Sequence, residues 1–491
     1  MNRYSLSFRF SLTGTILLFV LSCAALPGSP RFQPFADTIT LSGAHWGLAV
    51  RSLSTGEFLC KKDETKAFVP ASNMKLITTA VALVALGPDF RYTTGLYMGG
   101  EVRGGILHGD LFVLGSGDPA IAGSFNGGKA AGVFGEWADA LAGKGVREIE
   151  GAVTGDASCF DGQSLGAGWP WDDETSGYSA QISCLSFNDN AVEVEVSPGR
   201  NTGDPAGIII SPATGYVKVI NQAATAPAGT EGSLRFFRQP GTNTIKVSGA
   251  IANGSRPLRE WVSIDNPARY TATVLKETLE SRGIRVHGGI ALVGEERKAA
   301  DYATMKRVAE HISPPLKEII KITNKLSKNL YAEQMFRTLG KVLGGEGSTA
   351  ASAGVIRDQL SLMGIPDGPM AVYDGSGFSR LDLMTPLNMV LLLDYMSHHD
   401  YFPYFYDSLP VAGVDGTLER RMQGTPAAGR VHAKTGYLRH VRALSGYATA
   451  KDGGLIAFSL LVNNYSGTPE DVRAFQDNLC IMLSEYSGVG R

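Results

Sequence analysis

The sequence lacks several features that would point to common classes of protein. Its 491 residues include 45 Lys and Arg against 47 Asp and Glu, so neither sign of charge dominates. This balance gives no indication of a nucleic-acid partner or of another broadly anionic partner. Histidines number only 8, no two cysteines have metal-ligand spacing, and no repeat or low-complexity tract occurs. We therefore expect no metal ion, no other cofactor and no nucleic acid.

Long hydrophobic runs are also missing, except near the start. Arg3 and Arg9 precede the run LTGTILLFVLSCAALPGSP, which is too short to span a membrane comfortably and ends in small residues. This layout is typical of a secretory signal peptide. We predict a signal peptide over residues 1–24, cleaved after Ala24; a second alternative is acylation of Cys23, as in a lipoprotein. The protein is then exported, and it associates peripherally with a membrane only if Cys23 carries a lipid.

Cysteine is scarce. Four of the 5 cysteines follow the predicted signal peptide, namely Cys60, Cys159, Cys184 and Cys480. An even number in an exported protein permits disulfide bonds. Cys159 and Cys184 lie in one region and can pair, whereas Cys60 and Cys480 can pair only if the two ends of the chain meet. Two disulfides and four buried thiols both remain open.

The order of patterns along the chain predicts an α+β protein with a long insert. Residues 37–62 alternate between polar and apolar side chains around a Ser-Thr-Gly turn, which predicts a hairpin. From about residue 90 short strand-like runs alternate with turn residues, and long helical patterns return after about residue 303. We expect one discontinuous domain over residues 37–95 plus 303–491, interrupted at 96–302 by a β-rich accessory region of two sub-domains.

The stretch PASNMKLITTA places Ser72 three positions before Lys75, at the start of an apolar and therefore buried helix. Helix positions i and i+3 share a face, with Cβ atoms about 5–6 Å apart, so the hydroxyl and the amine can meet. Free N–H groups at a helix start also favour negative charge on the serine. Serine is equally a favoured N-cap, so the pattern by itself permits an ordinary helix start.

A second motif is Lys434-Thr435-Gly436, inside the strand pattern VHAKTGYL. We predict an inner strand, on which a lysine is unusual unless it lines a cleft. Gly436 would let a ligand approach the backbone closely. A lysine at the end of an edge strand is the plain alternative.

A third motif is Ser-x-Asn, which occurs three times. The copies at Ser124 and Ser186 fall in the β-rich region and are typical of turns. The copy at Ser327-Lys328-Asn329 forms a short polar break between two helical stretches. From such a break Ser327 and Asn329 can project into a cleft.

Ser-x-x-Lys, Ser-x-Asn and Lys-Thr-Gly, in this order, are the signature set of penicillin-binding proteins and serine β-lactamases. Further stretches narrow the resemblance: GWPWDDETSGYSAQISCLSFNDN (168–190), NLYAEQMFRTLG (329–340), YDGSGFSRLDLMTP (373–386) and VAGVDGTLERRM (411–422). The chain resembles the D-alanyl-D-alanine carboxypeptidase/endopeptidase family, the low-molecular-mass class C penicillin-binding proteins. The resemblance covers nearly the whole mature chain. It implies a β-lactamase/transpeptidase-like domain, an antiparallel sheet flanked by helices, and a location in the bacterial periplasm.

The resemblance implies a serine-type D-Ala-D-Ala carboxypeptidase or endopeptidase that acts on peptidoglycan stem peptides and is inhibited by β-lactams. Ser72 would form the acyl-enzyme, with Lys75 as its base. A neutral lysine at pH 7 costs about 5 kcal/mol unless the site lowers its pKa. Burial and the nearby Lys434 both act in that direction. Ser327 would relay a proton to the leaving amine, and Asn329 would hold Lys75 and the substrate amide.

Substrate contacts follow from the same resemblance. Lys434 and Thr435 would meet the terminal carboxylate of the substrate, and the backbone N–H groups of Ser72 and Tyr437 would form the oxyanion hole. Two positions depart from the family. Tyr437 replaces the usual Ser or Thr after Lys-Thr-Gly, so recognition of the carboxylate is weakened or reshaped. Lys328 adds a positive charge near the site unless its side chain faces solvent.

The stretch GWPWDDETSGY contains Trp169, Asp172 and Asp173. By resemblance this loop overhangs the cleft, and one of the two aspartates binds the ammonium of a meso-diaminopimelate side chain. The plain alternative is a surface loop held by its tryptophans.

Two other functions remain open at this point. A β-lactamase shares the acylation residues but must also deacylate the drug quickly, and the long insert argues against it. A non-catalytic wall scaffold keeps the fold without the reaction. Tyr437 is the feature that favours a scaffold, and the intact motif residues oppose it.

Overall fold

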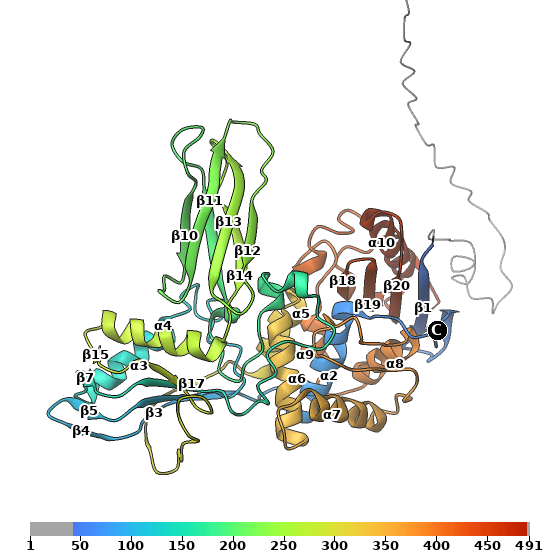
Figure 1. The fold of residues 1–491 in the computed structure, drawn as a ribbon. Coiled ribbons are helices and arrows are strands. Elements are labelled where there is room, and N and C mark those ends of the chain that lie inside the picture. Colours follow the sequence, from blue (N-terminus) through green and yellow to red (C-terminus); the bar gives the residue numbers. More distant parts are fainter. Residues whose placement is uncertain (1–42, 489–491) are drawn as a thin grey trace, which may run out of the picture.

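The computed structural model describes residues 43–488. The predicted signal peptide and Cys23 lie outside the described residues. Figure 1 shows two parts side by side: one contains both ends of the described chain, and the other is built from the middle of the sequence. Within residues 43–488 the structure contains no helix whose length and hydrophobicity would let it span a bilayer.

The first part is organised around a five-stranded antiparallel sheet with the order β18-β19-β20-β1-β2. Its strands are β1 (His45–Ser52), β2 (Phe58–Lys62), β18 (Val431–Leu438), β19 (Val441–Thr449) and β20 (Leu455–Asn463). The hairpin predicted near the N-terminus is confirmed as β1 and β2, which pair antiparallel. The prediction of an inner strand for Lys434 is wrong: β18 is an edge strand. Within residues 43–488 its outer edge is paired only by an isolated bridge between Val411 and His432.

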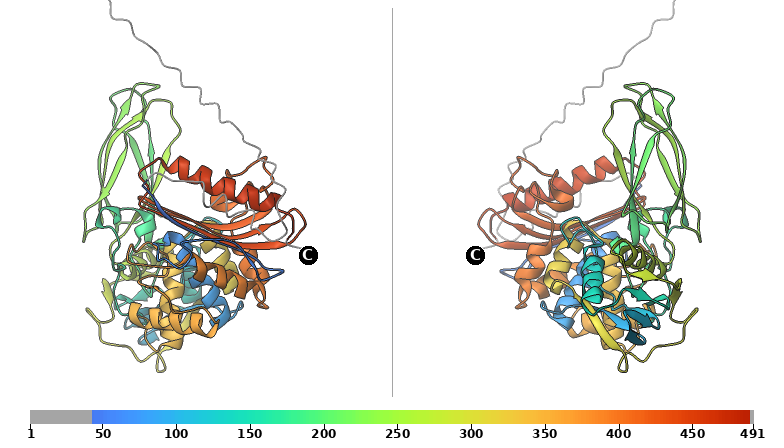
Figure 2. Two further views of the ribbon diagram at one scale, coloured as in Figure 1. Left: turned by 90° about the vertical axis from the view of Figure 1, so that its right-hand side faces the viewer. Right: turned by 90° about the vertical axis from the view of Figure 1, so that its left-hand side faces the viewer.

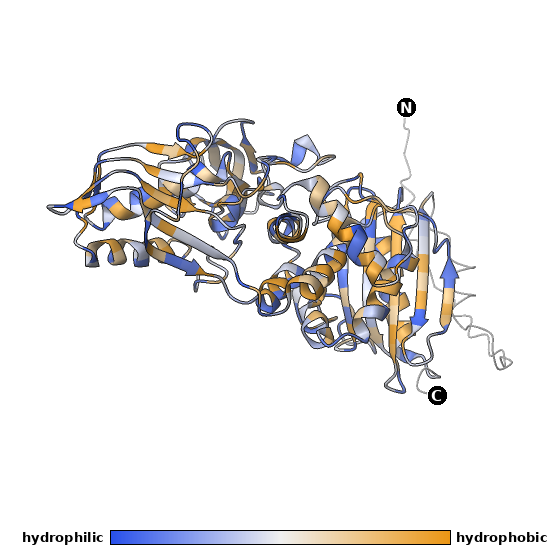
Figure 3. Ribbon diagram, turned by 90° about the horizontal axis from the view of Figure 1, so that it is seen from below, coloured by the Kyte–Doolittle hydropathy of each residue, from blue (hydrophilic) through white to orange (hydrophobic). Residues whose placement is uncertain are grey.

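Helices cover both faces of this sheet, as Figure 2 shows. The helix α10 (Pro469–Glu485) packs on one face, and α8 (Pro386–Ser397) packs on the other beside α2 (Met74–Leu86). Successive strand side chains point to opposite faces, so Leu48 and Val50 join the core under α10, while Ala49 joins the core under α2 and α8. The central strands are therefore apolar along most of their length, which Figure 3 shows in orange.

The helix predicted after Ser72 is confirmed as α2, and its side chains are buried from Met74 to Leu83. Gly87 ends it with φ +84°, a conformation that glycine adopts readily. Around α2 lie α5 (Leu316–Lys325), α6 (Asn329–Leu343), α7 (Thr349–Leu362) and α9 (Phe402–Ser408). α2 is thus the central helix of this part, and the residues at its start are held from several sides.

The second part is the β-rich region, with two sub-structures visible in Figure 1. The lower one contains the sheets β16-β8-β6-β3-β17 and β15-β7-β5-β4, together with two helices. Its elements are β3 (Thr93–Met98), β4 (Glu101–Arg103), β5 (Ile106–His108), β6 (Leu111–Leu114), α3 (Gly132–Gly143), β7 (Glu148–Ile149), β8 (Val153–Asp156), α4 (Pro267–Ser281), β15 (Arg285–Val286), β16 (Ile290–Leu292) and β17 (Lys306–Ile312).

The upright sub-structure contains the sheets β10-β9-β14 and β11-β13-β12. Its strands are β9 (Ala191–Ser197), β10 (Gly207–Ser211), β11 (Lys218–Ala226), β12 (Arg235–Arg238), β13 (Thr244–Ala252) and β14 (Leu258–Ser263). The two sub-structures share one hydrophobic core, whose buried members run from Leu96 to Leu292. Because β3 pairs with β17, we propose that the insert spans residues 93–312, slightly more than the predicted 96–302.

The cysteines follow neither of the two alternatives left open by the sequence. Cys159 and Cys184 form a disulfide, with their Cα atoms 5.8 Å apart. Cys60 in β2 and Cys480 in α10 belong to the same buried core and both keep their thiols. The two ends of the described chain do meet, through packing of β2 and α10 and not through a disulfide between Cys60 and Cys480.

Candidate active site

Ser72 lies in a turn of 3₁₀ helix, Ala71–Asn73, that leads directly into α2. Its side chain does not cap the helix, because the N-cap of α2 is Asn73 and no side chain forms a cap hydrogen bond there. Ala71 has φ +46°, a strained conformation for a residue other than glycine. Such strain persists only where the surroundings enforce it, and it places the following hydroxyl at the surface of a cleft.

Two glycines enforce this turn from either side. A Cβ on Gly377 would overlap the backbone oxygen of Ala71, and a Cβ on Gly436 would lie 2.9 Å from the backbone oxygen of Pro70. Asn73 also donates a hydrogen bond to the backbone oxygen of Lys434, at 2.8 Å. Gly436 therefore lets β18 pack closely against the Ser72 turn. From the sequence we expected this glycine to let a ligand approach the backbone.

Lys75 is completely buried, one turn below Ser72. Its Nζ donates to Ser72 Oγ at 3.0 Å, to Asn329 Oδ1 at 2.6 Å and to the backbone oxygen of Ser376 at 2.7 Å. Burial lowers the pKa of Lys75 to about 7, against the opposing influence of two nearby acids, Asp374 and Glu333. A neutral amine keeps two N–H donors for Asn329 and Ser376, and its lone pair then faces the Ser72 hydroxyl.

Lys434 is the second buried lysine of the site. Its Nζ donates to Ser327 Oγ at 2.8 Å and to the backbone oxygen of Thr435 at 3.0 Å. Burial, followed by repulsion from Lys75, lowers the pKa of Lys434 well below the usual lysine value. The three sequence motifs therefore lie together: Lys75 joins Ser72 to Asn329, and Lys434 binds Ser327 beside them.

The loop between α5 and α6 carries the Ser-x-Asn motif, as expected. Ser327 has φ +57°, and Asn329 is the first residue of α6. Lys328 neither adds charge to the cleft nor faces solvent freely. Its Nζ lies 2.6 Å from Asp189 Oδ2 in the insert. The expectation for Lys328 is wrong because side chains at 327 and 329 point one way and the side chain between them points the other.

Buried carboxylates beneath Lys75 were not singled out from the sequence. Glu333 accepts from the backbone N–H groups of Gly375 and Ser376, and Asp374 accepts from those of Ser376, Gly377 and Ser379. Burial raises the pKa of Glu333. These bonds shape the turn that aims the Ser376 oxygen at Lys75. The sequence does contain a signal for Glu333: it follows Asn329 by four positions, so the two side chains share one face of a helix.

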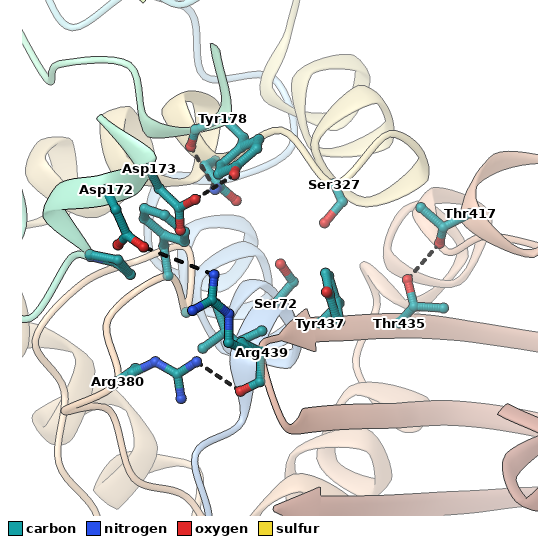
Figure 4. Close-up of a pocket in the computed structure, with 15 residues that line it drawn as sticks. Ser72, Asp172, Asp173, Tyr178, Ser327, Arg380, Thr417, Thr435, Tyr437 and Arg439 are labelled. Carbon is teal, nitrogen blue, oxygen red and sulfur yellow. Dashed lines mark hydrogen bonds and ion pairs between the residues drawn. The ribbon is translucent and has the colours of Figure 1, made fainter. Parts of the chain in front are cut away.

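The motif residues border a cleft of about 560 Å³. Figure 4 shows Ser72 in the middle, Ser327 and Thr435 on one side, and the loop with Asp172 and Asp173 on the other. The lining residues are Ser72, Pro170, Asp172, Asp173, Tyr178, Ser327, Asn329, Gly377, Phe378, Arg380, Thr417, Thr435, Tyr437, Leu438 and Arg439. Arg380, Thr417 and Arg439 were not predicted, and only the fold brings them to the cleft.

The three residues predicted from the overhanging loop have different partners in the structure. Asp172 Oδ2 lies 3.9 Å from an Arg439 guanidinium nitrogen, and Asp173 Oδ1 accepts a hydrogen bond from the Tyr178 hydroxyl at 2.8 Å. Trp169 is not part of the cleft lining. Its indole N–H donates to Asp374 Oδ2 at 2.9 Å, so this side chain fastens the loop to the turn under Lys75.

Tyr437 lines the cleft with a side chain that is 59% exposed. Its ring lies 3.8 Å from the guanidinium carbon of Arg442, its neighbour on β19. This stacking holds the ring upright at the rim. Thr435, two positions before Tyr437 on β18, donates its hydroxyl to Thr417 Oγ1 at 2.8 Å.

With the geometry established, comparison with known proteins decides the family. The D-Ala-D-Ala carboxypeptidase 3 (S13) family matches residues 33–486. The chain belongs to this family. A D-alanyl-D-alanine carboxypeptidase of Actinomadura sp. (strain R39) is 36% identical over 465 residues, which cover 91% of this chain and 82% of that relative. DacB of Haemophilus influenzae is 26% identical over 428 residues, 86% of each chain.

Solved structures agree with this assignment. Penicillin-binding protein 4 (dacB) of Haemophilus influenzae superposes with a TM-score of 0.78 at 26% identity, covering 91% of this chain and 97% of that one. The same protein in complex with a β-lactam gives a TM-score of 0.74 at 25% identity. The predicted family and the α+β fold class are confirmed. The S13 protein described here is a serine-type D-Ala-D-Ala carboxypeptidase, so the scaffold alternative is not supported.

Proposed function

We propose that this carboxypeptidase cleaves stem peptides ending in D-Ala-D-Ala through an acyl-enzyme on Ser72, with Lys75 as the base. One observation carries the proposal: Lys75 Nζ lies 3.0 Å from Ser72 Oγ, and burial lowers the pKa of Lys75 to about 7. At that pKa a large share of Lys75 is a free amine at neutral pH. A base with a pKa near the working pH suits proton transfer in a transition state.

The acylation step follows from the contacts around Ser72. Its proton passes to Lys75 as Oγ bonds to the carbonyl carbon of the penultimate D-Ala. The oxygen of the tetrahedral intermediate is held by the backbone N–H groups of Ser72 and Tyr437. As the C–N bond breaks, Ser327 passes its proton to the departing amine and takes up in turn the proton that Lys75 received from Ser72. Lys434, whose Nζ lies 2.8 Å from Ser327 Oγ, orients that hydroxyl beside the leaving group. Water then hydrolyses the ester and restores Ser72.

Recognition of the substrate's terminal carboxylate falls to Lys434 and Thr435 in this proposal. The Thr435 hydroxyl is already hydrogen-bonded to Thr417, so a substrate carboxylate would find two hydroxyl groups in place. Gly436 keeps β18 close to the Ser72 turn. Tyr437 offers a ring, not a short hydroxyl, at the next position, and this supports a weaker hold on the carboxylate.

The aspartates of the overhanging loop are proposed to bind the ammonium of a diaminopimelate side chain. Both Asp172 and Asp173 line the cleft, and opposite charge is the simplest recognition of an ammonium group. Asp172 faces Arg439, whereas Asp173 is bound by Tyr178. Peptides with and without that side-chain ammonium, tested on Asp172→Asn and Asp173→Asn, would show which carboxylate contributes. Whether cross-linked peptides are also cleaved stays a prediction, to be measured on purified muropeptide dimers.

Export to the periplasm is part of the proposal. The Cys159–Cys184 disulfide supports it, since such bonds persist mainly in oxidising compartments. Mass analysis of the mature N-terminus distinguishes cleavage after Ala24 from acylation of Cys23. A lipid mass on Cys23 would also establish the peripheral membrane attachment.

The test of the acyl-enzyme is intact mass spectrometry after brief exposure to benzylpenicillin. Wild type should gain the mass of one drug molecule, Ser72→Ala should gain none, and Ser361→Ala, an exposed serine on α7, should behave as wild type. Failure of folded wild type to form an adduct, or an adduct on Ser72→Ala, would overturn the proposal. Rapid turnover of nitrocefin by wild type would indicate the β-lactamase alternative instead.

A further inference from the structure

The loop that carries Ser327 and Asn329 is short and strained. It runs from the end of α5 at Lys325 to the start of α6 at Asn329, and Ser327 has φ +57°. Leu326 in the same loop is 56% exposed, so packing of that side chain does not hold the loop in place. A left-handed conformation at a residue other than glycine costs about 1–3 kcal/mol and needs contacts that enforce it.

Two contacts of Lys328 hold this conformation: its backbone N–H donates to the backbone oxygen of Thr323 at 3.1 Å, as at many helix ends, and its side chain reaches the insert. Lys328 Nζ lies 2.6 Å from Asp189 Oδ2, and it also lies 5.7 Å from the Trp261 ring centre and 5.9 Å from that of Tyr331. The side chains of Lys328 and Asp189 are 31% and 13% exposed. Partial burial makes this pair less screened by solvent than an ordinary surface ion pair.

Asp189 is itself held rigidly. Asn188, Asp189 and Asn190 have φ of +51°, +58° and +51°, three left-handed residues in succession. The Asn188 amide donates to the backbone oxygen of Ala191 at 2.9 Å, and the Asn190 amide donates to that of Gln181 at 2.8 Å. The Asp189 carboxylate is therefore held in place by its turn and fixes the ammonium group of Lys328.

Other residues of α6 are also bound to the insert. The Asn329 amide donates to the backbone oxygen of Tyr178 at 2.8 Å, and the Tyr331 hydroxyl lies 2.8 Å from Ser124 Oγ. About two turns further along the helix, Arg337 pairs with Asp161 at 2.7 Å. The Lys328–Asp189 pair lies at the end next to the cleft.

We propose that Asp189 is a positioning residue for the carboxypeptidase reaction. Through Lys328 it holds the strained loop so that Ser327 faces Lys434 and Asn329 faces Lys75. The insert then contributes to catalysis indirectly, since Asp189 contacts neither the substrate nor the nucleophile. The inference rests on the roles proposed above for Ser327 and Asn329.

The experiment measures the rate of acylation by benzylpenicillin over a range of concentrations, with rapid quenching and intact mass detection. Asp189→Asn and Lys328→Met should each lower the saturating rate by about tenfold or more, since small misplacements of reacting groups cost up to about 10²-fold. The concentration for half-saturation should change little. The double variant should be no slower than either single variant, and Lys328→Arg should keep most of the rate.

Asp161→Asn is the matched control, because it breaks another ion pair between the insert and α6, about two turns along the helix from Asn329. It should leave the saturating rate near wild type, and thermal unfolding of every variant separates loss of fold from loss of position. Wild-type rates in Asp189→Asn and Lys328→Met would overturn the proposal, as would an equal loss in Asp161→Asn. Absence of an adduct on wild type would instead overturn the acyl-enzyme on Ser72, so the two failures are distinguishable.

Discussion

Lys75 Nζ lies 2.6 Å from Asn329 Oδ1, although the two residues are separated by 254 positions in the sequence. An amide oxygen only accepts hydrogen bonds, so this contact takes one N–H of Lys75 and fixes the direction of the others. The backbone oxygen of Ser376 takes a second, at 2.7 Å. The remaining position on the Lys75 nitrogen faces Ser72. If that position is a lone pair, Lys75 can accept the Ser72 proton; if it holds a proton, it cannot.

The pH dependence of acylation should follow the ionisation of Lys75. Burial lowers its pKa to about 7, so the free amine is scarce below that pH and dominant above it. The rate of acylation by benzylpenicillin should therefore rise with pH through about 7 and then level off. Rates measured from pH 5 to pH 9 test this, with thermal unfolding at each pH as the control. A profile that is flat below pH 7 would contradict Lys75 as the base.

Asn329→Asp should move that profile to higher pH. A carboxylate in place of the amide favours the charged form of Lys75, and an adjacent opposite charge typically shifts a pKa by about 1–3 units. Asn329→Ala removes the hydrogen bond without adding charge, so it should slow acylation without an alkaline shift. Equal midpoints in the two variants would show that the titrating group is not Lys75.

Gly377→Ala should destabilise the protein by about 2–3 kcal/mol, because the new Cβ would overlap the Ala71 backbone at a position with φ +75°. Acylation should fall as well, since the displaced turn carries Ser72. Gly354→Ala is a control of opposite sign: it lies inside α7 with nothing near its Cβ position, and alanine should stabilise the helix by about 1 kcal/mol. Urea unfolding measures both, and a neutral Gly377→Ala would contradict the packing described.

Tyr437→Thr should raise the acylation efficiency for benzylpenicillin by about tenfold. A hydrogen bond to a charged group contributes about 1.5–3 kcal/mol, and the short hydroxyl would supply one to the drug carboxylate. Tyr437→Phe keeps the ring over Arg442 and should match wild type. Lower efficiency in Tyr437→Thr would show that the ring itself contributes to binding. Neither change should alter stability much, because the side chain is 59% exposed.

Reduction of the disulfide should weaken the fold. The bond joins residues 25 positions apart, and closing a loop of that size restricts the unfolded chain by about 3 kcal/mol. Urea unfolding with and without a reductant should show this difference in wild type. The Cys159→Ser, Cys184→Ser double variant should be insensitive to the reductant. Equal stability of wild type in both conditions would contradict the prediction.

The sequence by itself determined the chemical groups of the site and the class of fold. Ser72 and Lys75 are three positions apart at the start of an apolar helix, and helix geometry alone brings such a pair onto one face. Alternation predicted the β1–β2 hairpin, and the order of three motifs predicted the family. These inferences succeed because each motif and each alternation pattern can be read from a short stretch of the sequence.

Tertiary structure alone decided the rest. The edge position of β18 depends on which strands find each other, and the periodicity of a single strand does not contain that information. Cys60 and Cys480 share a core without forming a disulfide, while Cys159 and Cys184 form one. Lys328 turns to Asp189 because a rigid turn 139 residues earlier offers a carboxylate there. The sequence indicated a buried helix at Lys75, but the complete burial of this side chain, and hence how far its pKa falls, depends on long-range contacts.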